Sequence, residues 1–334
     1  MMPSRRALLS MDFGTPVPVA DHWIRLQRTA MACRFTILLS GEDAHQVPAA
    51  QDELDEVERV EAALTVFREA SDLVRLNRRA AAAPVAASPE LFALLALCRE
   101  LHAETEGAFD ITSTPLSRCW GFLAREGRLP ATEEIEAARA LVGMDAVTLD
   151  ASRRTVRFQR PGVELNLGSI GKGYALRRIG ARLQGRGLGH ALLSAAGSSV
   201  LAIGGRDGGW LIDVRSPQRP DRCLARLRLR NGALGTSGAG EQFVEVGGTR
   251  YGHVIDPRTG WPAQGVLSAS VVHRDAALAD ALATAFCVGG PELARRYCAT
   301  HPQTLALLTP SEGPVRTEVI GAYPGATLLE AAAA

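Results

Sequence analysis

The chain keeps its only lysine in its most glycine-rich loop. Residues 166–175 read NLGSIGKGYA, and this run lies between an extended-looking stretch and a helical pattern that begins near Tyr174. Glycines in such a connection let backbone N–H groups come close to a ligand, and a helix N-terminus favours an anion. Lys172 is the single lysine among 37 lysines and arginines, and its compact ammonium suits one phosphate oxygen or a polar ring edge. A solvated helix start is the alternative, and this stretch alone leaves both interpretations open.

A carboxylate and a hydroxyl are spaced one helical turn apart further along the chain. Asp280 and Thr284 lie at i and i+4 in a predicted helix over residues 275–288, so both oxygens point from one small and apolar face. Such oxygens can hold a hard cation, with water or a substrate phosphate completing the shell. The alternative is a surface aspartate and a threonine bonded back to its own helix. Beside a glycine-rich loop, the pair suggests Mg²⁺ on a pyrophosphate.

The segment 251–262, YGHVIDPRTGWP, places a histidine at the end of a predicted strand. Asp256 follows His253 by three residues and begins a turn with Pro257. A histidine with a nearby carboxylate can act as a general base with an orienting partner. The alternative is that Asp256 only accepts hydrogen bonds from turn amides. The density of Gly, Asp, Thr and Pro in this segment favours a functional role.

Hydrophobic periodicity and turn residues predict helices mainly in the first half of the chain and strands mainly in the second. The predicted helices cover Val47–Leu64, 71–77, 88–105, 130–140, 174–184, 275–288 and 291–299. The predicted strands cover 34–39, 146–149, 155–159, 191–193, 200–203, 210–214, 224–229, 242–246, 250–253, 267–272, 304–308 and 315–319. This order indicates the α+β class with an antiparallel sheet.

Composition argues against several classes of function. The net charge of +1 does not suggest a nucleic-acid or membrane-surface partner, and the six cysteines have no CxxC or CxH spacing typical of a zinc site. No apolar run of 18 residues predicts a transmembrane segment. Only three apolar residues separate Arg5-Arg6 from Ser10, too few for a signal peptide. We therefore expect a cytoplasmic protein, with an exported or periplasmic one as the alternative if the true start differs.

Taken together, seven short motifs resemble those of the ApbE family, the FAD:protein FMN transferases. They are Met31-Ala32-Cys33, Gly107-Ala108-Phe109-Asp110, residues 166–175, residues 195–198, Thr236-Ser237-Gly238, residues 253–262 and residues 280–285. The resemblance covers residues 23–322 and implies a single ApbE-like, T-fold-like catalytic domain, or two α+β subdomains within it. Residues 1–22 are expected to be a flexible arm, and residues 323–334 a disordered alanine-rich tail.

The resemblance also implies a reaction and a set of site residues. The family binds FAD with Mg²⁺, transfers FMN to a Thr or Ser hydroxyl of an acceptor flavoprotein, and releases AMP. The implied metal ligands are Asp280, Thr284 and a backbone oxygen at Ser169, while His253 matches the proposed base, so that His253 and Asp280 are the expected catalytic residues. The implied flavin contacts are Met31, Ala108, Phe109, Asp110, Asn166, Lys172 and Val254. The chain has no Ser/Thr-Gly-Ala-Thr stretch of the acceptor type, so any acceptor should be another protein.

The chain departs from the usual family pattern at a few positions. Asn166 stands where Asp is usual, and residues 196–198 read Ala-Gly-Ser in place of Gly-Gly-Asp. Ala32-Cys33 replace Gly-Thr, and Ala239-Gly240 follow Thr236-Ser237-Gly238 where the family commonly has an aromatic residue nearby. These departures bear on flavin affinity and acceptor choice. They leave two alternatives to the transferase: an FAD pyrophosphatase that yields FMN and AMP, and a flavin-binding protein without turnover.

Overall fold

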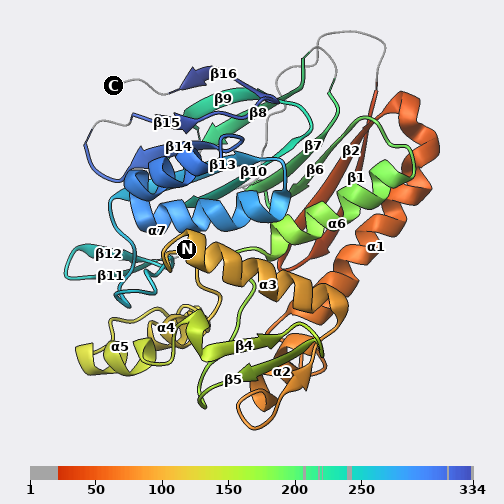
Figure 1. Cartoon of the computed structure of the whole chain (residues 1–334). Helices are drawn as coiled ribbons and strands as arrows, with labels where there is room; N and C mark the ends of the chain where they lie inside the picture. The colour runs from red at the N-terminus through yellow and green to blue at the C-terminus, as the bar shows by residue number, and fades with distance from the viewer. Residues whose placement is uncertain are drawn as a thin grey trace, which may run out of the picture.

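One antiparallel sheet of eight strands forms the centre of the computed structural model, in the order β1-β2-β6-β7-β10-β13-β14-β15 (Figure 1). These strands are β1 (Trp23–Ala30), β2 (Cys33–Ser40), β6 (Ala191–Ala195), β7 (Ser199–Ile203), β10 (Gly232–Gly238), β13 (Val266–His273), β14 (Leu305–Pro310) and β15 (Glu318–Gly321). Neighbouring strands all run antiparallel, as the sequence predicted. The structure describes residues 22–205, 208–216, 219, 221–238, 243–313 and 316–331. The predicted arm lies outside these residues, apart from His22.

The central strands of the large sheet are buried on both faces. Side chains of a strand alternate between the two sides of a sheet, so each strand contributes to two apolar layers. In β2, Phe35 and Ile37 face the helices, whereas Leu38 faces the other side. A small sheet covers that other side. It consists of β16 (Ala326–Ala331), β9 (Cys223–Leu229) and β8 (Trp210–Arg215). The fold therefore has a helical layer, the large sheet and the small sheet, as Figure 1 shows.

The predicted disorder of the C-terminal tail is wrong for residues 326–331. These residues form β16 and pair with β9, with Ala326 opposite Leu229. Just before this strand, the buried Tyr323 donates its hydroxyl hydrogen to the backbone carbonyl of Asn231. The alanines gave no strand signal of their own, and the order comes from pairing with a strand about one hundred residues earlier. Residues 332–334 lie outside the described part of the chain.

The helices in the described part of the chain are α1 (Val47–Leu64), α2 (Asp72–Arg79), α3 (Pro89–Glu104), α4 (Thr114–Cys119), α5 (Thr132–Arg139), α6 (Gly171–Gly185) and α7 (Ala276–Thr300), with 3-10 turns η1 (Gly41–Gln46) and η2 (Met144–Ala146). Of these, α1, α6 and α7 cover the opposite face of the large sheet. α6 and α7 lie against each other and against the central strands, and α1 packs on α6 (Figure 1). The helix pair α6–α7 is thus fixed on a rigid sheet.

α7 crosses the middle of this layer. Asp275 caps it by accepting hydrogen bonds from the N–H groups of Ala277 and Leu278, at 2.8 and 3.4 Å. Gly290, at φ 69°, breaks the helical conformation inside α7, which confirms the two predicted helical segments. By length and composition α7 could cross a membrane, but 61% of its apolar window is buried inside the protein, as in a core helix.

A separate apolar cluster lies beside the main core. It joins α4 and α5 to a hairpin of β11 (Phe243–Val246) and β12 (Thr249–Gly252). The residues that we call the aromatic cluster are Trp120, Phe122, Tyr251 and Trp261, with ring centroids 5.4 to 6.3 Å apart where they touch. A third, three-stranded sheet packs on the main core; it holds β3 (Val85–Ala86), β5 (Thr155–Phe158) and β4 (Val147–Asp150), and β4–β5 is the predicted hairpin.

Candidate active site

A cavity of about 400 Å³ lies where the start of α6, the middle of α7, the turn after α3 and the chain after β12 meet. The site residues predicted from the sequence that line it are Ala108, Phe109, Asp110, Asn166, Ser169, Lys172, His253, Val254, Asp280 and Thr284. Met31 is the exception. It lies at φ 49° in the turn between β1 and β2, packs against the main core and is not part of the cavity lining.

Asp280 is held at the floor of the cavity by two hydrogen bonds. It is 4% exposed, and its two carboxylate oxygens accept from the Gly173 N–H at 2.9 Å and from the Ser199 hydroxyl at 2.8 Å. These two hydrogen bonds fix the carboxylate in one orientation beside the N-terminus of α6.

Two glycines allow α7 to come this close to its neighbours. A Cβ on Gly173 would lie 2.1 Å from the carbonyl oxygen of Ala276, and a Cβ on Gly235 would lie 2.4 Å from that of Ala279. Such contacts are sterically impossible, so only glycine fits at either position. Gly173 in the lysine loop therefore serves helix packing and the Asp280 hydrogen bond. Gly235 lets α7 pack closely on β10. This strand is central in the large sheet, and it was not predicted because its small residues carry little strand signal.

Hydroxyl groups extend the polar floor beyond Asp280. The Oγ1 of Thr284 lies 3.0 Å from the Oγ of Ser237 on β10, and both residues line the cavity. Thr236 and Ser198 also line it, and the Thr236 N–H donates to the Ser198 carbonyl at 2.7 Å. The predicted i, i+4 pair on α7 thus faces hydroxyls on a neighbouring strand.

Two of the segments that depart from the usual family pattern form ordered turns at the cavity, whereas Ala239-Gly240 lie outside the described residues. The Oδ1 of Asn166 accepts a hydrogen bond from the Gly168 N–H at 2.8 Å, an interaction that an aspartate could also make. Between β6 and β7, Ala196 adopts φ 54° and Gly197 φ 76°. The alanine therefore occupies a left-handed conformation that costs roughly 1 kcal/mol or more for a residue other than glycine. Both turns bring their next residues, Gly168 and Ser198, to the cavity.

Asp110 separates the cavity from a second, more open cavity of about 530 Å³. One oxygen of its carboxylate accepts from the N–H and the hydroxyl of Thr112, at 2.7 and 2.6 Å. The other lies 3.3 Å from Nδ1 of His102, a ring that faces the second cavity. The hydrogen bond to Asp110 raises the pKa of His102, and burial opposes that increase. Asp110 is thus oriented from both sides.

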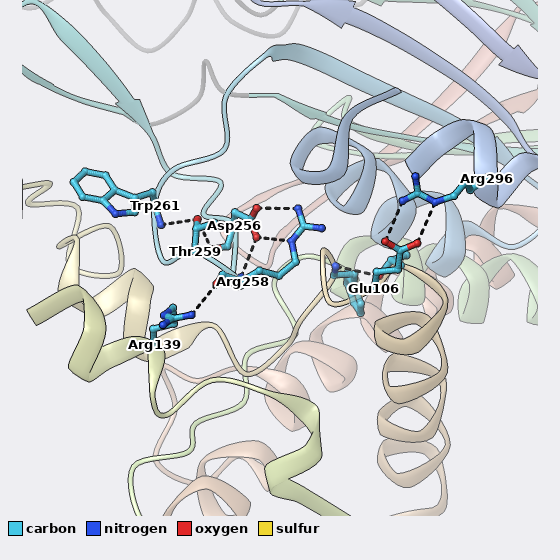
Figure 2. Close-up of polar contacts among 9 residues, drawn as sticks. Glu106, Arg139, Asp256, Arg258, Thr259, Trp261 and Arg296 are labelled. Carbon is cyan, nitrogen blue, oxygen red and sulfur yellow. Dashed lines mark hydrogen bonds and ion pairs between the residues drawn. The ribbon is translucent and has the colours of Figure 1, made fainter. Parts of the chain in front are cut away.

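His253 enters the cavity from a closed loop that follows β12. Within this loop the Ala263 N–H donates to the Val254 carbonyl at 2.8 Å, and Asp256 and Trp261 are joined by a backbone hydrogen bond of 2.8 Å. The Asp256 carboxylate accepts hydrogen bonds from the backbone and guanidinium of Arg258, at 2.8 to 2.9 Å (Figure 2). The structure therefore gives Asp256 the turn-forming role that the sequence left as one of two alternatives.

The oxygen groups on the cavity floor fit a hard cation. Asp280 supplies one carboxylate, and Thr284 and Ser237 supply hydroxyls beside it. Mg²⁺ is typically held by one or two carboxylates and completes its shell with water and substrate phosphate. In the described part of the chain no three His, Cys, Asp or Glu residues group as a metal site, so a zinc-type centre finds no support there.

Some residues of the cavity gave little or no signal in the sequence. Ser199 carries no motif of its own, although it bonds Asp280. Phe122, Leu123 and Arg125 reach the cavity from the loop after α4, where only aromatic content was visible. Such partners are set by tertiary packing, which spacing along the chain cannot reveal.

Comparison with known proteins gives concordant matches. The sequence model of the ApbE family matches residues 31–309. The chain is 32% identical over 249 residues to the FAD:protein FMN transferase of Vibrio cholerae, covering 72% of this chain and 74% of that protein. Its fold is similar to the crystal structure of the ApbE protein of Thermotoga maritima, with a TM-score of 0.80, 29% identity, and coverage of 90% of this chain and 97% of the other. It is also similar to the apo form of the Pseudomonas stutzeri flavinyl transferase ApbE, with a TM-score of 0.76, 26% identity and coverage of 90% and 95%.

Proposed function

The chain belongs to the ApbE family, and from this premise we propose that it is a transferase that moves FMN from FAD to a Thr or Ser hydroxyl of an acceptor flavoprotein and releases AMP. One observation carries the proposal. Asp280, Thr284, Lys172 and His253, which come from three separate segments of the chain, line one cavity. A carboxylate–hydroxyl pair, an ammonium group and an imidazole that can act as a base are the groups that phosphoryl transfer between an FAD pyrophosphate and a hydroxyl requires.

The α6–α7 side of the cavity suits the pyrophosphate. Lys172 lies in the first turn of α6, where the helix dipole favours an anion. Asp280 and Thr284 would hold Mg²⁺, together with a backbone oxygen at Ser169. When bound, the ion would offset the charge that develops on the leaving phosphate. In this proposal Lys172 binds the diphosphate directly, Asp280 and Thr284 would orient it through the ion, and none of the three exchanges protons with it.

The other side of the cavity suits the flavin and the acceptor. Ala108, Phe109 and Asp110 provide an apolar surface that ends in a carboxylate, and Val254 lines the cavity next to His253. In this proposal His253 accepts the proton of the acceptor hydroxyl. The hydroxyl oxygen then bonds to the phosphorus of the FMN half, while the bond from that phosphorus to the oxygen bridging to AMP breaks. AMP leaves with the bridging oxygen.

The proposal is tested by incubating the purified protein with FAD, Mg²⁺ and a recombinant acceptor domain that bears a Ser/Thr-Gly-Ala-Thr segment. We expect AMP in solution and an acceptor whose mass increases by one FMN less water, and both should disappear with EDTA. Omitting the acceptor separates transfer from hydrolysis, because a pyrophosphatase would release FMN and AMP at an unchanged rate. Binding of FAD without any AMP would contradict the proposal and support a flavin-binding protein without turnover.

A further inference from the structure

Arg258 lies between Pro257 and Thr259 in the loop that carries His253. Its guanidinium forms a two-pronged pair with Asp256, in which Nε lies 2.9 Å from Oδ1 and Nη2 lies 2.8 Å from Oδ2. Its backbone N–H donates to the same Oδ1 at 2.9 Å. This fork fixes the loop in one conformation, which a single ammonium group cannot do as well.

The same side chain contacts the end of α3, next to the segment that carries Asp110. Its Cγ lies 3.7 Å from the place where a Cβ on Gly107 would be. Gly107, at φ 76°, ends α3 and directly precedes Ala108. The stem of Arg258 therefore packs over the turn that leads into the predicted flavin contacts.

Further polar contacts tie this junction to the rest of the fold. Glu106 forms a two-pronged pair with Arg296 of α7, at 3.1 and 3.0 Å, and Figure 2 shows Arg258 between Asp256 and that pair. The Asp256 carboxylate and, more weakly, Glu106 raise the pKa of Arg258 above its ordinary value. On the other side, Arg139 of α5 donates to the backbone carbonyl of Arg258 at 3.1 Å.

We propose that Arg258 is a positioning residue for the transfer step: it holds the loop that carries His253 against the turn that carries Asp110. This inference rests on the function proposed above. Transfer requires the acceptor hydroxyl and its base to approach the phosphorus bound on the α7 side, and an error of 1 Å in such an arrangement can cost on the order of 100-fold in rate. Arg258 lies outside the reaction cavity and acts only through the loop.

The test compares Arg258→Ala and Arg258→Lys with the wild type, using FAD, Mg²⁺ and the same recombinant acceptor domain. We expect the kcat of acceptor flavinylation to fall on the order of 10- to 100-fold in Arg258→Ala. Arg258→Lys keeps the charge and loses the fork, so it should recover part of that loss. The dissociation constant of FAD, measured by quenching of flavin fluorescence, should rise much less than kcat falls, because the diphosphate is held on the unchanged α6–α7 side and only the flavin contacts adjoin the released turn.

Arg226 offers a matched control. It forms the same fork on Asp213 in the small sheet, with Nε 2.6 Å from Oδ1 and Nη2 3.1 Å from Oδ2, and it does not line the cavity. Arg226→Ala should leave kcat unchanged.

Three outcomes would overturn the inference. Wild-type kcat in both Arg258 variants would do so, and so would a loss of kcat that only follows a loss of folded protein in thermal unfolding. If Arg258→Ala does not fold, Arg258→Lys decides by the same measurements. A wild-type chain that modifies no acceptor would overturn the proposed function, and this inference with it.

Discussion

The two sides of the cavity are anchored to the fold in different ways. On one side, Asp280 sits on a buried helix that approaches α6 and β10 as closely as glycine permits. On the other side, His253 follows the β11–β12 hairpin, in which Phe243 is 44% exposed. Trp261, in the loop that carries His253, is 39% exposed. Close packing tolerates no displacement, whereas surface loops held by a few contacts can adjust.

This difference indicates that the two sides of the cavity have separate roles in the reaction. The packed side presents a carboxylate in one fixed geometry, which suits a metal and a diphosphate that are the same in every turnover. The loop side is held by the Trp120 Nε1–H bond to the Gly260 carbonyl at 2.9 Å, by the aromatic cluster and by Arg258. In the proposed function that side receives the protein acceptor, for which a surface-exposed, separately anchored loop is suitable. The predictions below test whether the two sides can be damaged independently.

The largest effect is expected from Asp280→Asn. The amide can still accept a hydrogen bond from Gly173 or Ser199, but the charge that would hold Mg²⁺ is gone. We expect Mg²⁺-dependent AMP release to fall by more than about 10³-fold, since a metal on a phosphoryl group contributes several kcal/mol to catalysis. Asp275→Asn is the matched control on the same helix, because asparagine caps a helix nearly as well as aspartate. Equal AMP release by the wild type and Asp280→Asn would remove Asp280 from the metal site.

His253→Ala should damage the other side alone. Loss of a general base typically costs on the order of 100-fold or more, so flavinylation of the acceptor should slow by about that factor. The dissociation constant of FAD should change little, because the groups predicted to bind the diphosphate are untouched. Rates of flavinylation measured beside FAD titrations separate the two effects. A parallel loss of binding and transfer would make His253 a ligand contact and would contradict the division between the sides.

Gly173→Ala tests how tightly the packed side is built. The added methyl group would lie 2.1 Å from a backbone oxygen of α7, so α6 and α7 must separate. We expect a loss of about 3 kcal/mol in the free energy of unfolding, measured by urea denaturation, together with loss of Mg²⁺-dependent AMP release. In Gly171→Ala, the control two residues earlier, no atom beyond the chain neighbours and the nearby backbone of α6 lies within 4 Å of the new methyl group, and stability should not fall. Equal stability of the two variants would disprove the packing argument.

The sequence predicted which residues reach the cavity better than it predicted their hydrogen-bond partners, for physical reasons. Helical spacing placed Asp280 and Thr284 on one face of α7, and the structure puts both in the cavity. The same reasoning could not find Ser199, because the hydrogen bond that joins it to Asp280 spans 81 positions of sequence. It also left the partner of Asp256 open, since a turn carboxylate serves amides, an arginine or a histidine equally well.

The fold shows the same limit. Most strands with apolar alternation or strong β-formers were predicted, but β1 was missed although its burial alternates. β10, built of glycine and small residues, was also missed although it is central. β16 was taken for a disordered tail because its order comes from a distant partner strand. Local periodicity therefore predicts elements that are stable through their own pattern, and fails for those that depend on a neighbour.

The smallest effect concerns His102, which supports Asp110 at the boundary between the two sides. Its imidazole, 26% exposed as a side chain, lies 3.3 Å from Asp110, and the hydrogen bond to this carboxylate raises the His102 pKa above its usual 6.5, with Asp145 adding a weaker contribution. The charged groups of Glu106, Arg139 and Arg258 line the same second cavity.

A pKa that is higher in the folded state means that the imidazolium stabilises the fold fully below pH 6.5, and that this stabilisation is lost as the pH rises through the folded-state pKa. His102→Gln keeps a neutral hydrogen-bond donor and cannot titrate. We therefore expect the wild type to exceed His102→Gln in free energy of unfolding by about 1 kcal/mol at pH 5.5, and the difference to shrink above neutral pH. Urea denaturation of both proteins over this pH range measures it, and the comparison cancels the titration of all other groups. A difference in free energy of unfolding that stays constant with pH would mean that His102 supports Asp110 without carrying charge. The stability of the boundary between the two sides would then not depend on protonation of His102.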